Sequence, residues 1–190
     1  YYRCDSCCGF DRAEMTQGRR VNDFYPTPHS IVEALVNNLF FISDQHFSDE
    51  QVWEPCCGDG RLSESLRAYF KEDVVVGDIA TGQDFFKIQK APAKVLITNP
   101  PFKNIRMFID HAFAIGVDQM ALVCPERLWA CKKGHEQWQR HRPSIWANLN
   151  WREDYLQKGG SPDRALAIGI WEKPHSDWCS YQVWDKPQEI

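Results

Sequence analysis

The order of apolar segments along the chain constrains its fold more than any other feature. Short, almost continuously apolar runs alternate with stretches whose apolar residues recur at helical spacing. Buried parallel strands have this uninterrupted apolar character, and the helices between them cover both faces of the sheet. The pattern predicts strands at 51–55, 73–79, 94–102, 119–125, 144–151 and 164–172, and helices at 28–41, 61–70, 106–115 and 135–142. We therefore expect an α/β fold with a mostly parallel central sheet, in which ligands bind at the carboxyl ends of the strands.

The length and composition fit one compact domain. The 190 residues are 43% hydrophobic, enough for a substantial core. We expect the domain to span residues 23–174, with polar, irregular flanks at 1–22 and 175–190. No apolar run approaches the roughly 20 residues of a membrane span, and no secretory signal is recognisable, so a cytoplasmic location without a membrane partner is expected. Cys56 and Cys57 lie beside glycines and Cys124 ends an apolar run, which suits reduced thiols.

Glycines and acids stand in the loops that follow the first two predicted strands. The stretch EPCCGDG at 54–60 opens into a helix, and its glycines allow the backbone to approach a ligand closely. Asp78 ends the next strand, where an acid can accept from both hydroxyls of a ribose. Asp84, with Phe85 and Phe86 behind it, can accept from an adenine amine while the rings wall the base. Each feature alone also fits an ordinary turn or strand cap, but their order at successive strand ends favours a nucleoside ligand.

The stretch ITNPPF at 97–102 places two prolines after Asn99, at the end of an apolar run. Proline fixes φ, lacks an N–H group and disfavours helical geometry in the residue before it, so the pair stops the strand and stiffens the backbone. A simple turn is one interpretation. The other is a binding site for a flat group with an exocyclic amine, formed by an amide side chain and an aromatic ring.

The ordered series DFYPTP, WEPCCGDG, VVVGDI, DFF and ITNPPF resembles the amino-methyltransferases that use S-adenosylmethionine, especially small phage-type DNA adenine-N6 methyltransferases. The resemblance covers about residues 23–173 and implies a Rossmann-like class I methyltransferase fold. NPPF also occurs in adenine-N6 RNA methyltransferases, and NPPY serves glutamine methylation in proteins.

The same resemblance implies a cofactor site for S-adenosylmethionine. Its methionine end would lie beneath the segment of Tyr25, Thr27 and Pro28, and its amino acid part beside the loop of Glu54, Pro55, Cys57, Gly58 and Gly60. Asp78 and Ile79 would border the ribose, and Asp84 with Phe85 the adenine.

The resemblance further implies transfer of a methyl group to the N6 amine of adenine in DNA, by direct in-line attack on a flipped-out base. The Asn99 oxygen and the Pro100 carbonyl would accept the amine hydrogens, Pro101 would help to hold them rigid, and Phe102 would stack on the ring. No metal is required. An RNA substrate, and a cofactor-binding subunit without catalytic activity, remain alternatives, and the chain could act as a monomer or a homodimer.

A basic segment stands out in an otherwise acidic chain. Residues 127–152 hold six basic side chains and one acid, so the segment is net +5 while the rest of the chain, at a total of −4, is net −9. The segment is either a nucleic-acid-binding edge or the solvated face of a helix. We assign the nucleic-acid contacts to Lys132, Lys133, Arg140 and Arg142, with Trp151, expected in a loop, stacking on a base. The chain has no room for a separate target-recognition domain.

Cysteines near the start raise the question of a metal. Cys4, Cys7 and Cys8 have partly metal-like spacing, but no second pair follows nearby, so free thiols are the favoured interpretation.

Overall fold

The structure is a computed structural model that describes residues 27–39, 51–70, 74–153, 164–174 and 177–188. Tyr25, the front cysteines and the loop after Glu153 lie outside these ranges. The helices are α1 (His29–Asn38), α2 (Arg61–Phe70), α3 (Ile105–Ala114) and α4 (Lys132–Arg140), with short 3-10 turns η5 (Ile79–Thr81), η6 (Phe85–Lys87) and η7 (Phe102–Asn104). The strands are β1 (Val52–Glu54), β2 (Val75–Val76), β3 (Val95–Thr98), β4 (Gln119–Pro125), β5 (Ile145–Glu153), β6 (Arg164–Glu172) and β7 (Ser180–Trp184).

The strands form one seven-stranded sheet in the order β2-β1-β3-β4-β6-β5-β7. β2, β1, β3 and β4 pair in parallel, β6 runs antiparallel to both β4 and β5, and β5 pairs in parallel with β7. This arrangement confirms the mostly parallel sheet. The chain leaves β1 toward β2 on one side and returns to β3 on the other, so the strand order reverses between β1 and β3. In open α/β sheets ligands bind outside the carboxyl ends of the strands at such a point.

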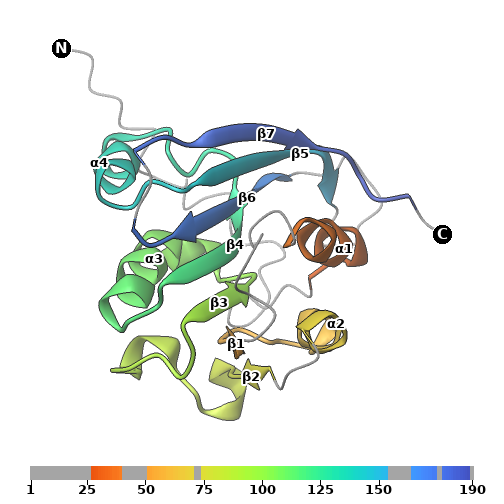
Figure 1. Cartoon of the computed structure of the whole chain (residues 1–190), viewed down its shortest axis with the longest axis vertical. Coiled ribbons are helices and arrows are strands. Elements are labelled where there is room, and N and C mark those ends of the chain that lie inside the picture. The colour runs from red at the N-terminus through yellow and green to blue at the C-terminus, as the bar shows by residue number, and fades with distance from the viewer. Residues whose placement is uncertain (1–26, 40–50, 71–73, 154–163, 175–176, 189–190) are drawn as a thin grey trace, which may run out of the picture.

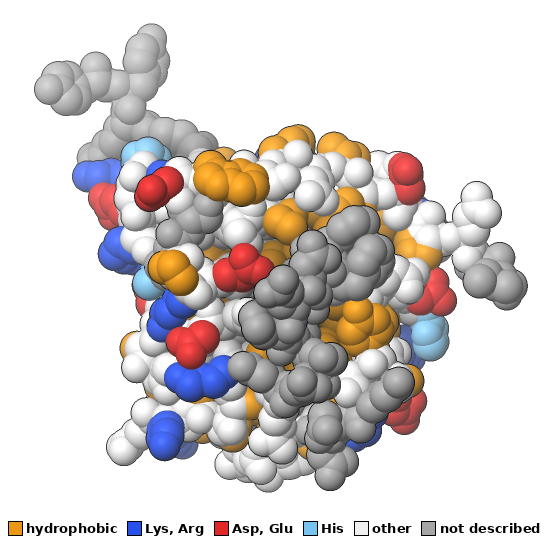
Figure 2. Space-filling view, viewed as in Figure 1, with side chains coloured by type: hydrophobic (Ala, Val, Ile, Leu, Met, Phe, Trp, Pro, Cys, Tyr) orange, Lys and Arg blue, Asp and Glu red, His pale blue; other side chains and the backbone are white. Residues whose placement is uncertain are grey.

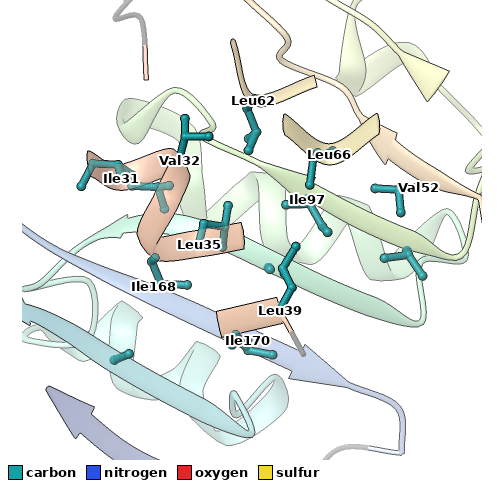
Figure 3. Packing of buried hydrophobic residues seen from close by; sticks show 14 of the residues in the cluster. Ile31, Val32, Leu35, Leu39, Val52, Leu62, Leu66, Ile97, Ile168 and Ile170 are labelled. Atoms are coloured by element: carbon teal, nitrogen blue, oxygen red, sulfur yellow. The ribbon is translucent and has the colours of Figure 1, made fainter. Parts of the chain in front are cut away.

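Helices cover both faces of the sheet, with α1 and α2 on one side and α3 and α4 on the other (Figure 1). β3 is buried throughout because its alternate residues serve both layers. Ile97 joins the cluster that contains Ile31 and Leu35 of α1 and Leu66 of α2 (Figure 3), whereas Leu96 joins the cluster around α3. None of the helices in the described ranges is long and apolar enough to cross a membrane.

The C-terminal region contributes a strand that the sequence did not predict. Residues 180–184, placed by the sequence in an irregular flank beyond Pro174, pair along β5 from Ile145↔Ser180 to Leu149↔Trp184. β7 lies at the edge of the sheet, where Tyr181 and Val183 are 65% and 58% exposed. An edge strand exposed on one face alternates polar and apolar residues instead of forming an apolar run, so its pattern over five residues is weak.

α4 begins three residues earlier than predicted. The Cys131 thiol caps the helix by accepting from the Gly134 amide at 3.4 Å. Gly134 weakens the helical pattern in the sequence, yet packing requires it there. A Cβ at this position would lie 2.5 Å from the Leu128 carbonyl oxygen, so only glycine lets the helix start against the preceding turn.

Candidate functional site

Three of the predicted site loops lie at the carboxyl edge of the parallel strands, on both sides of the point where the strand order reverses. Glu54 ends β1, Asp78 follows β2 and Asn99 follows β3. Because β2, β1 and β3 are neighbours and run in parallel, their carboxyl ends share one edge of the sheet. The fold therefore brings the three predicted loops together.

The glycine loop between β1 and α2 is held in a tight shape by its own backbone. The Cys57 amide donates to the Gly77 carbonyl at 3.0 Å, and the Gly60 amide donates to the Cys57 carbonyl at 2.8 Å. Gly58 and Gly60 have φ of 54° and 87°, a region that favours glycine. Among the described residues other than its chain neighbours, none has an atom within 4 Å of the position that a Cβ at Gly60 would take, so the space beside this residue is open.

Asp78 joins the glycine loop to the turn after β2. One carboxylate oxygen accepts from the Gly58 amide at 2.9 Å and the other from the Ala80 amide at 2.7 Å. A carboxylate oxygen has two lone pairs, so each can still accept from a ligand hydroxyl. The neighbouring Ile79 is 59% exposed and offers an apolar surface beside the acid.

The structure places Phe85 deeper than the sequence suggested. Phe85 is 6% exposed and stacks on Phe108, with ring centroids 3.9 Å apart, so it belongs to the core beneath the site. Phe86 is 38% exposed and is the more accessible ring of the pair. Asp84 accepts from the Phe86 amide at 3.1 Å and lies 3.5 Å from the Lys87 ammonium.

Glu54 lies beneath the glycine loop rather than on its surface. It is 1% exposed and accepts a hydrogen bond from the Ser63 hydroxyl. Burial is the main cause that raises the pKa of Glu54 to about 7. The hydrogen bond from Ser63 and the charge of Arg67 lower this pKa by smaller amounts, and the negative charges of Asp59 and Asp78 raise it. Ser63 was missed by sequence reasoning, although its place in the first turn of the helix after the glycine loop is a usable signal.

Asn99 is tied to the segment before α1. Its side-chain nitrogen donates to the Thr27 hydroxyl oxygen at 3.1 Å. Thr27 is 9% exposed, and the following Pro28 caps α1 with extended backbone geometry. With its nitrogen bound to Thr27, the amide presents its oxygen elsewhere, as an acceptor.

The second proline continues into a short turn. The Pro101 carbonyl accepts from the Asn104 amide at 3.2 Å, which starts η7 and leads directly into α3. Phe102, the first residue of η7, is half-buried and packs against the clusters on both faces of the sheet. Its ring therefore has a structural role in addition to the predicted stacking role.

The basic side chains at the two ends of α4 have different surroundings. α4 begins at Lys132, after the turn that follows the carboxyl end of β4, and ends at Arg140 before the start of β5. Lys132 and Lys133 are exposed, and Lys132 lies 4.0 Å from Glu136. The preceding Cys131 thiol lies 3.0 Å from the guanidinium of Arg106, at the start of α3, which connects this end of α4 to the site edge. At the other end, Arg140 lies 3.3 Å from Asp110, and Arg142 donates to the Asp177 carbonyl. Figure 2 shows basic side chains along the side formed by α3 and α4, with acids between them.

Trp151 lies within β5, not in a loop as the sequence suggested. It is half-buried against the cluster that includes α1, and its indole nitrogen donates to the Glu153 carboxylate at 2.6 Å. β5 extends two residues further than predicted, past an irregularity in its pairing with β6 between Asn148 and Arg152. In this position Trp151 has a direct role in core packing, whereas its predicted role in base stacking has no such direct support.

The residues at the edge fit S-adenosylmethionine, the cofactor that the resemblance implies. Asp78 and Asp84 place negative charge at the edge, which suits a ligand with a cationic sulfur and an ammonium group. Asp78 has acceptor capacity for a ribose, and the open space beside Gly60 leaves room for a ligand close to the backbone. Among the described residues, no group of three or more His, Cys, Asp or Glu side chains could hold a metal ion.

Comparison with known proteins identifies the fold. No protein-family model and no curated protein sequence matches the chain. Solved structures do match it. A class I S-adenosylmethionine-dependent methyltransferase assigned in Listeria monocytogenes has a TM-score of 0.61 and 14% identity, covering 90% of this chain and 68% of its own. A protein assigned as an RNA methyltransferase in Pyrococcus horikoshii has a TM-score of 0.52 and 19% identity, covering 78% of this chain and 86% of its own.

A third match is the type I restriction-modification methyltransferase subunit from Streptococcus thermophilus, with a TM-score of 0.57 and 10% identity over 80% of this chain. The present chain spans 46% of that subunit's length. At these identities the likeness concerns the fold. The chain has the Rossmann-like fold of the class I methyltransferases.

Proposed function

We propose that the protein transfers a methyl group from S-adenosylmethionine to the N6 amine of adenine in DNA. The observation that carries this proposal is the position of Asn99-Pro100-Pro101-Phe102 at the carboxyl end of β3, with the Asn99 amide fixed by Thr27. The motif lies beside the glycine loop and Asp78, which fit the cofactor. A turn with no chemical task would not require an oriented amide at this edge of the sheet.

The residues around Asn99 supply positioning. When bound, S-adenosylmethionine supplies a methyl group activated by its cationic sulfur. The adenine amine is a poor nucleophile because its lone pair is delocalised into the ring. The Asn99 oxygen and the Pro100 carbonyl accept its two hydrogens, which favours tetrahedral geometry at the nitrogen and aims its lone pair at the cofactor.

Two features bear on the nucleic acid. Lys132 and Lys133 are exposed close to the site edge and suit a phosphate backbone. The flipped base must leave its stack to reach Asn99. The structural match to a methyltransferase subunit of a restriction-modification system favours DNA as the substrate. An RNA substrate is the second candidate, favoured by the similar length of the Pyrococcus horikoshii protein.

The test is a methyl-transfer assay with labelled S-adenosylmethionine and separate pools of DNA, RNA and protein, followed by mass spectrometry of the nucleosides. We expect N6-methyladenine in DNA. The matched variant is Asn99→Ala, which should lower the rate by about 10²–10³ because one preorganised acceptor is removed, while cofactor affinity holds.

Three other outcomes would correct the proposal. N6-methyladenine in RNA alone would reassign the substrate, and 4-methylcytosine would keep the role of Asn99 and change the base. Cofactor binding without transfer to any pool would identify a non-catalytic subunit, for which size-exclusion chromatography with light scattering would then define the assembly.

A further inference from the structure

A groove lined by aromatic residues lies outside the catalytic edge, between α4 and the last strands of the sheet. Its volume is about 640 Å³, within the range of small-molecule sites. Trp129, Trp138, Trp146 and Tyr181 supply the aromatic walls, and Arg127 and His135 also line it. The proposed methyl transfer uses none of these residues.

The aromatic rings stand at steep angles to one another rather than in one stack. Trp129 meets Trp138 at 75° and Trp146 at 63°, each with ring centroids 5.2 Å apart. Trp146 is almost fully buried, whereas Trp138 is half-buried and Tyr181 is 65% exposed. The floor of the groove is therefore fixed by the core, while Tyr181 presents a face to a ligand.

One wall of the groove is polar and held by hydrogen bonds. The Asn148 side-chain nitrogen donates to the Glu126 carboxylate and to the Tyr181 hydroxyl oxygen, both at 3.0 Å. The Tyr181 hydroxyl hydrogen can thus donate to a ligand. Within the described ranges, the Asn148 side-chain oxygen and the Trp129 indole nitrogen are buried without a hydrogen-bond partner. A flat ligand with hydrogen-bonding groups at its edge complements this wall.

Aromatic sites commonly bind either a methylated ammonium group or a nucleotide base, and the charges around the groove distinguish these two classes of ligand. A methylammonium group fits an aromatic cage with a free acid. Glu126 keeps its negative charge while it accepts from Asn148, but Arg127 also lines the groove, and Lys132 and Lys133 begin the adjoining helix. These three cations outnumber the nearby acids Glu126 and Glu136, which favours an anionic ligand. A nucleotide can stack its base on an accessible aromatic ring and place its phosphate near these cations.

We propose that the groove binds an unpaired base of the same nucleic-acid strand that is methylated; this inference rests on the proposed function. Glu126 and Arg127 follow the carboxyl end of β4, beside the edge that holds Asn99. β3 and β5 are three strand spacings apart, roughly 14 Å. One strand rises about 3.4 Å per nucleotide in the duplex and more when it is extended, so a segment of about four nucleotides or fewer is enough to span this distance. The groove would then contribute to the choice of the sequence around the methylated base.

Tyr181→Ala and Val183→Ala form a matched pair for the test. Both side chains are exposed on the same face of β7, but only Tyr181 lines the groove. The probe is a 5′-fluorescein-labelled 20-nucleotide single-stranded DNA that contains adenines, measured by fluorescence anisotropy. Tyr181→Ala should weaken binding about 5- to 150-fold, because it removes the ring on which a base stacks, and Val183→Ala should match wild type. Tyr181→Phe, which keeps the ring, should weaken binding much less than Tyr181→Ala.

Photo-crosslinking locates the base directly. The same oligonucleotide carrying 5-iodouracil at positions up to four nucleotides from an adenine should crosslink to peptides that contain Trp129, Trp138 or Tyr181. Equal affinities of the Tyr181→Ala and Val183→Ala proteins, or crosslinks confined to other peptides, would overturn the groove assignment. Tyr181-dependent binding of a trimethyl-lysine peptide, with oligonucleotide binding unaffected, would overturn it in favour of a protein ligand.

The two proposals fail separately. If wild type methylates DNA and Asn99→Ala abolishes the activity, the proposed function stands whatever the groove binds. If wild type methylates no nucleic acid but Tyr181→Ala still weakens oligonucleotide binding, the groove is a nucleic-acid site and the catalytic proposal is wrong.

Discussion

The side-chain nitrogen of Asn99 donates to the hydroxyl oxygen of Thr27 at 3.1 Å, across 72 positions of sequence. A side-chain amide can present either its oxygen or its nitrogen to a ligand, and a flip exchanges an acceptor for a donor. The bond to Thr27 engages the nitrogen, so the oxygen remains to accept from an amine. Thr27, in the segment before α1, therefore contacts the candidate catalytic amide after β3, in addition to any contact that this segment makes with the cofactor.

Replacing Thr27 tests this orientation. Thr27→Val preserves the shape of the side chain but removes the acceptor, so the amide should lose its fixed direction and kcat should fall about 10- to 100-fold. Thr27→Ser keeps a hydroxyl and should stay close to wild type. Steady-state kinetics at saturating substrate measures the role of Thr27 in orienting Asn99, and calorimetry with S-adenosylmethionine measures any role of Thr27 in binding the cofactor. A decrease in cofactor affinity with unchanged kcat would show that Thr27 serves the cofactor instead.

Replacing Asp78 tests the cofactor site. Asp78→Ala removes two acceptors for ribose hydroxyls, each worth at most roughly 1.5–3 kcal/mol as a charged partner. It also releases the Gly58 and Ala80 amides, so a modest decrease in thermal stability is expected together with a large decrease in cofactor affinity. Calorimetry on the folded variant measures the affinity.

Asp59→Asn is the matched control for Asp78. Asp59 lies in the same loop but pairs with Arg61 at 3.1 Å on the surface. The Asp59→Asn substitution should change cofactor affinity little. Equal effects of the two changes would indicate a general role of negative charge rather than a specific contact of Asp78.

The pKa of Glu54 predicts how stability depends on pH. Burial raises this pKa from 4.5 to about 7, so the folded state keeps a proton that the unfolded state releases. The free energy of unfolding should therefore fall as the pH rises from about 4.5 to about 7, by about 3 kcal/mol in total from this group. Glu54→Gln is neutral at every pH, should lack this decrease and should be more stable than wild type at pH 8.

Urea denaturation at pH 5 and pH 8 checks the Glu54 prediction. The difference in unfolding free energy between Glu54→Gln and wild type is the quantity to compare, because other titrating groups cancel in it. A difference that does not change with pH would mean that Glu54 is charged in the folded protein at pH 5.

The two ends of α4 should contribute unequally to nucleic-acid binding. Replacing Lys132 and Lys133 with Gln should weaken binding and reduce the slope of log K against log salt by about 0.7–0.9 for each phosphate that is no longer neutralised. Arg140→Gln is the control, because Arg140 lies at the opposite end of α4 and is 3.3 Å from Asp110, a closer ion pair than the 4.0 Å contact of Lys132 with Glu136. Anisotropy titrations at several salt concentrations measure the slopes. If Arg140→Gln reduces the slope as much as the lysine changes, the whole helix faces the nucleic acid.

Local sequence patterns were sufficient to predict six of the seven strands of the described sheet and to place the candidate site residues at strand ends. Buried strands such as 119–125 and 164–172 are apolar apart from polar residues at their ends, and this local pattern locates them, so both were predicted with the bounds that the structure shows. Glycines, acids and prolines at strand ends are equally local signals. They placed Gly58, Asp78 and Asn99 at one edge of the sheet.

Which side chains meet depends on tertiary packing. The bond between Asn99 and Thr27, the burial of Glu54 against Ser63 and the stacking of Phe85 on Phe108 join separate segments, and no local pattern encodes such contacts. β7 and the position of Trp151 within β5 likewise depend on partner strands, because an edge strand takes its register from its neighbour. The aromatic groove exists only because packing brings Trp129, Trp138 and Tyr181 together from a turn, a helix and an edge strand.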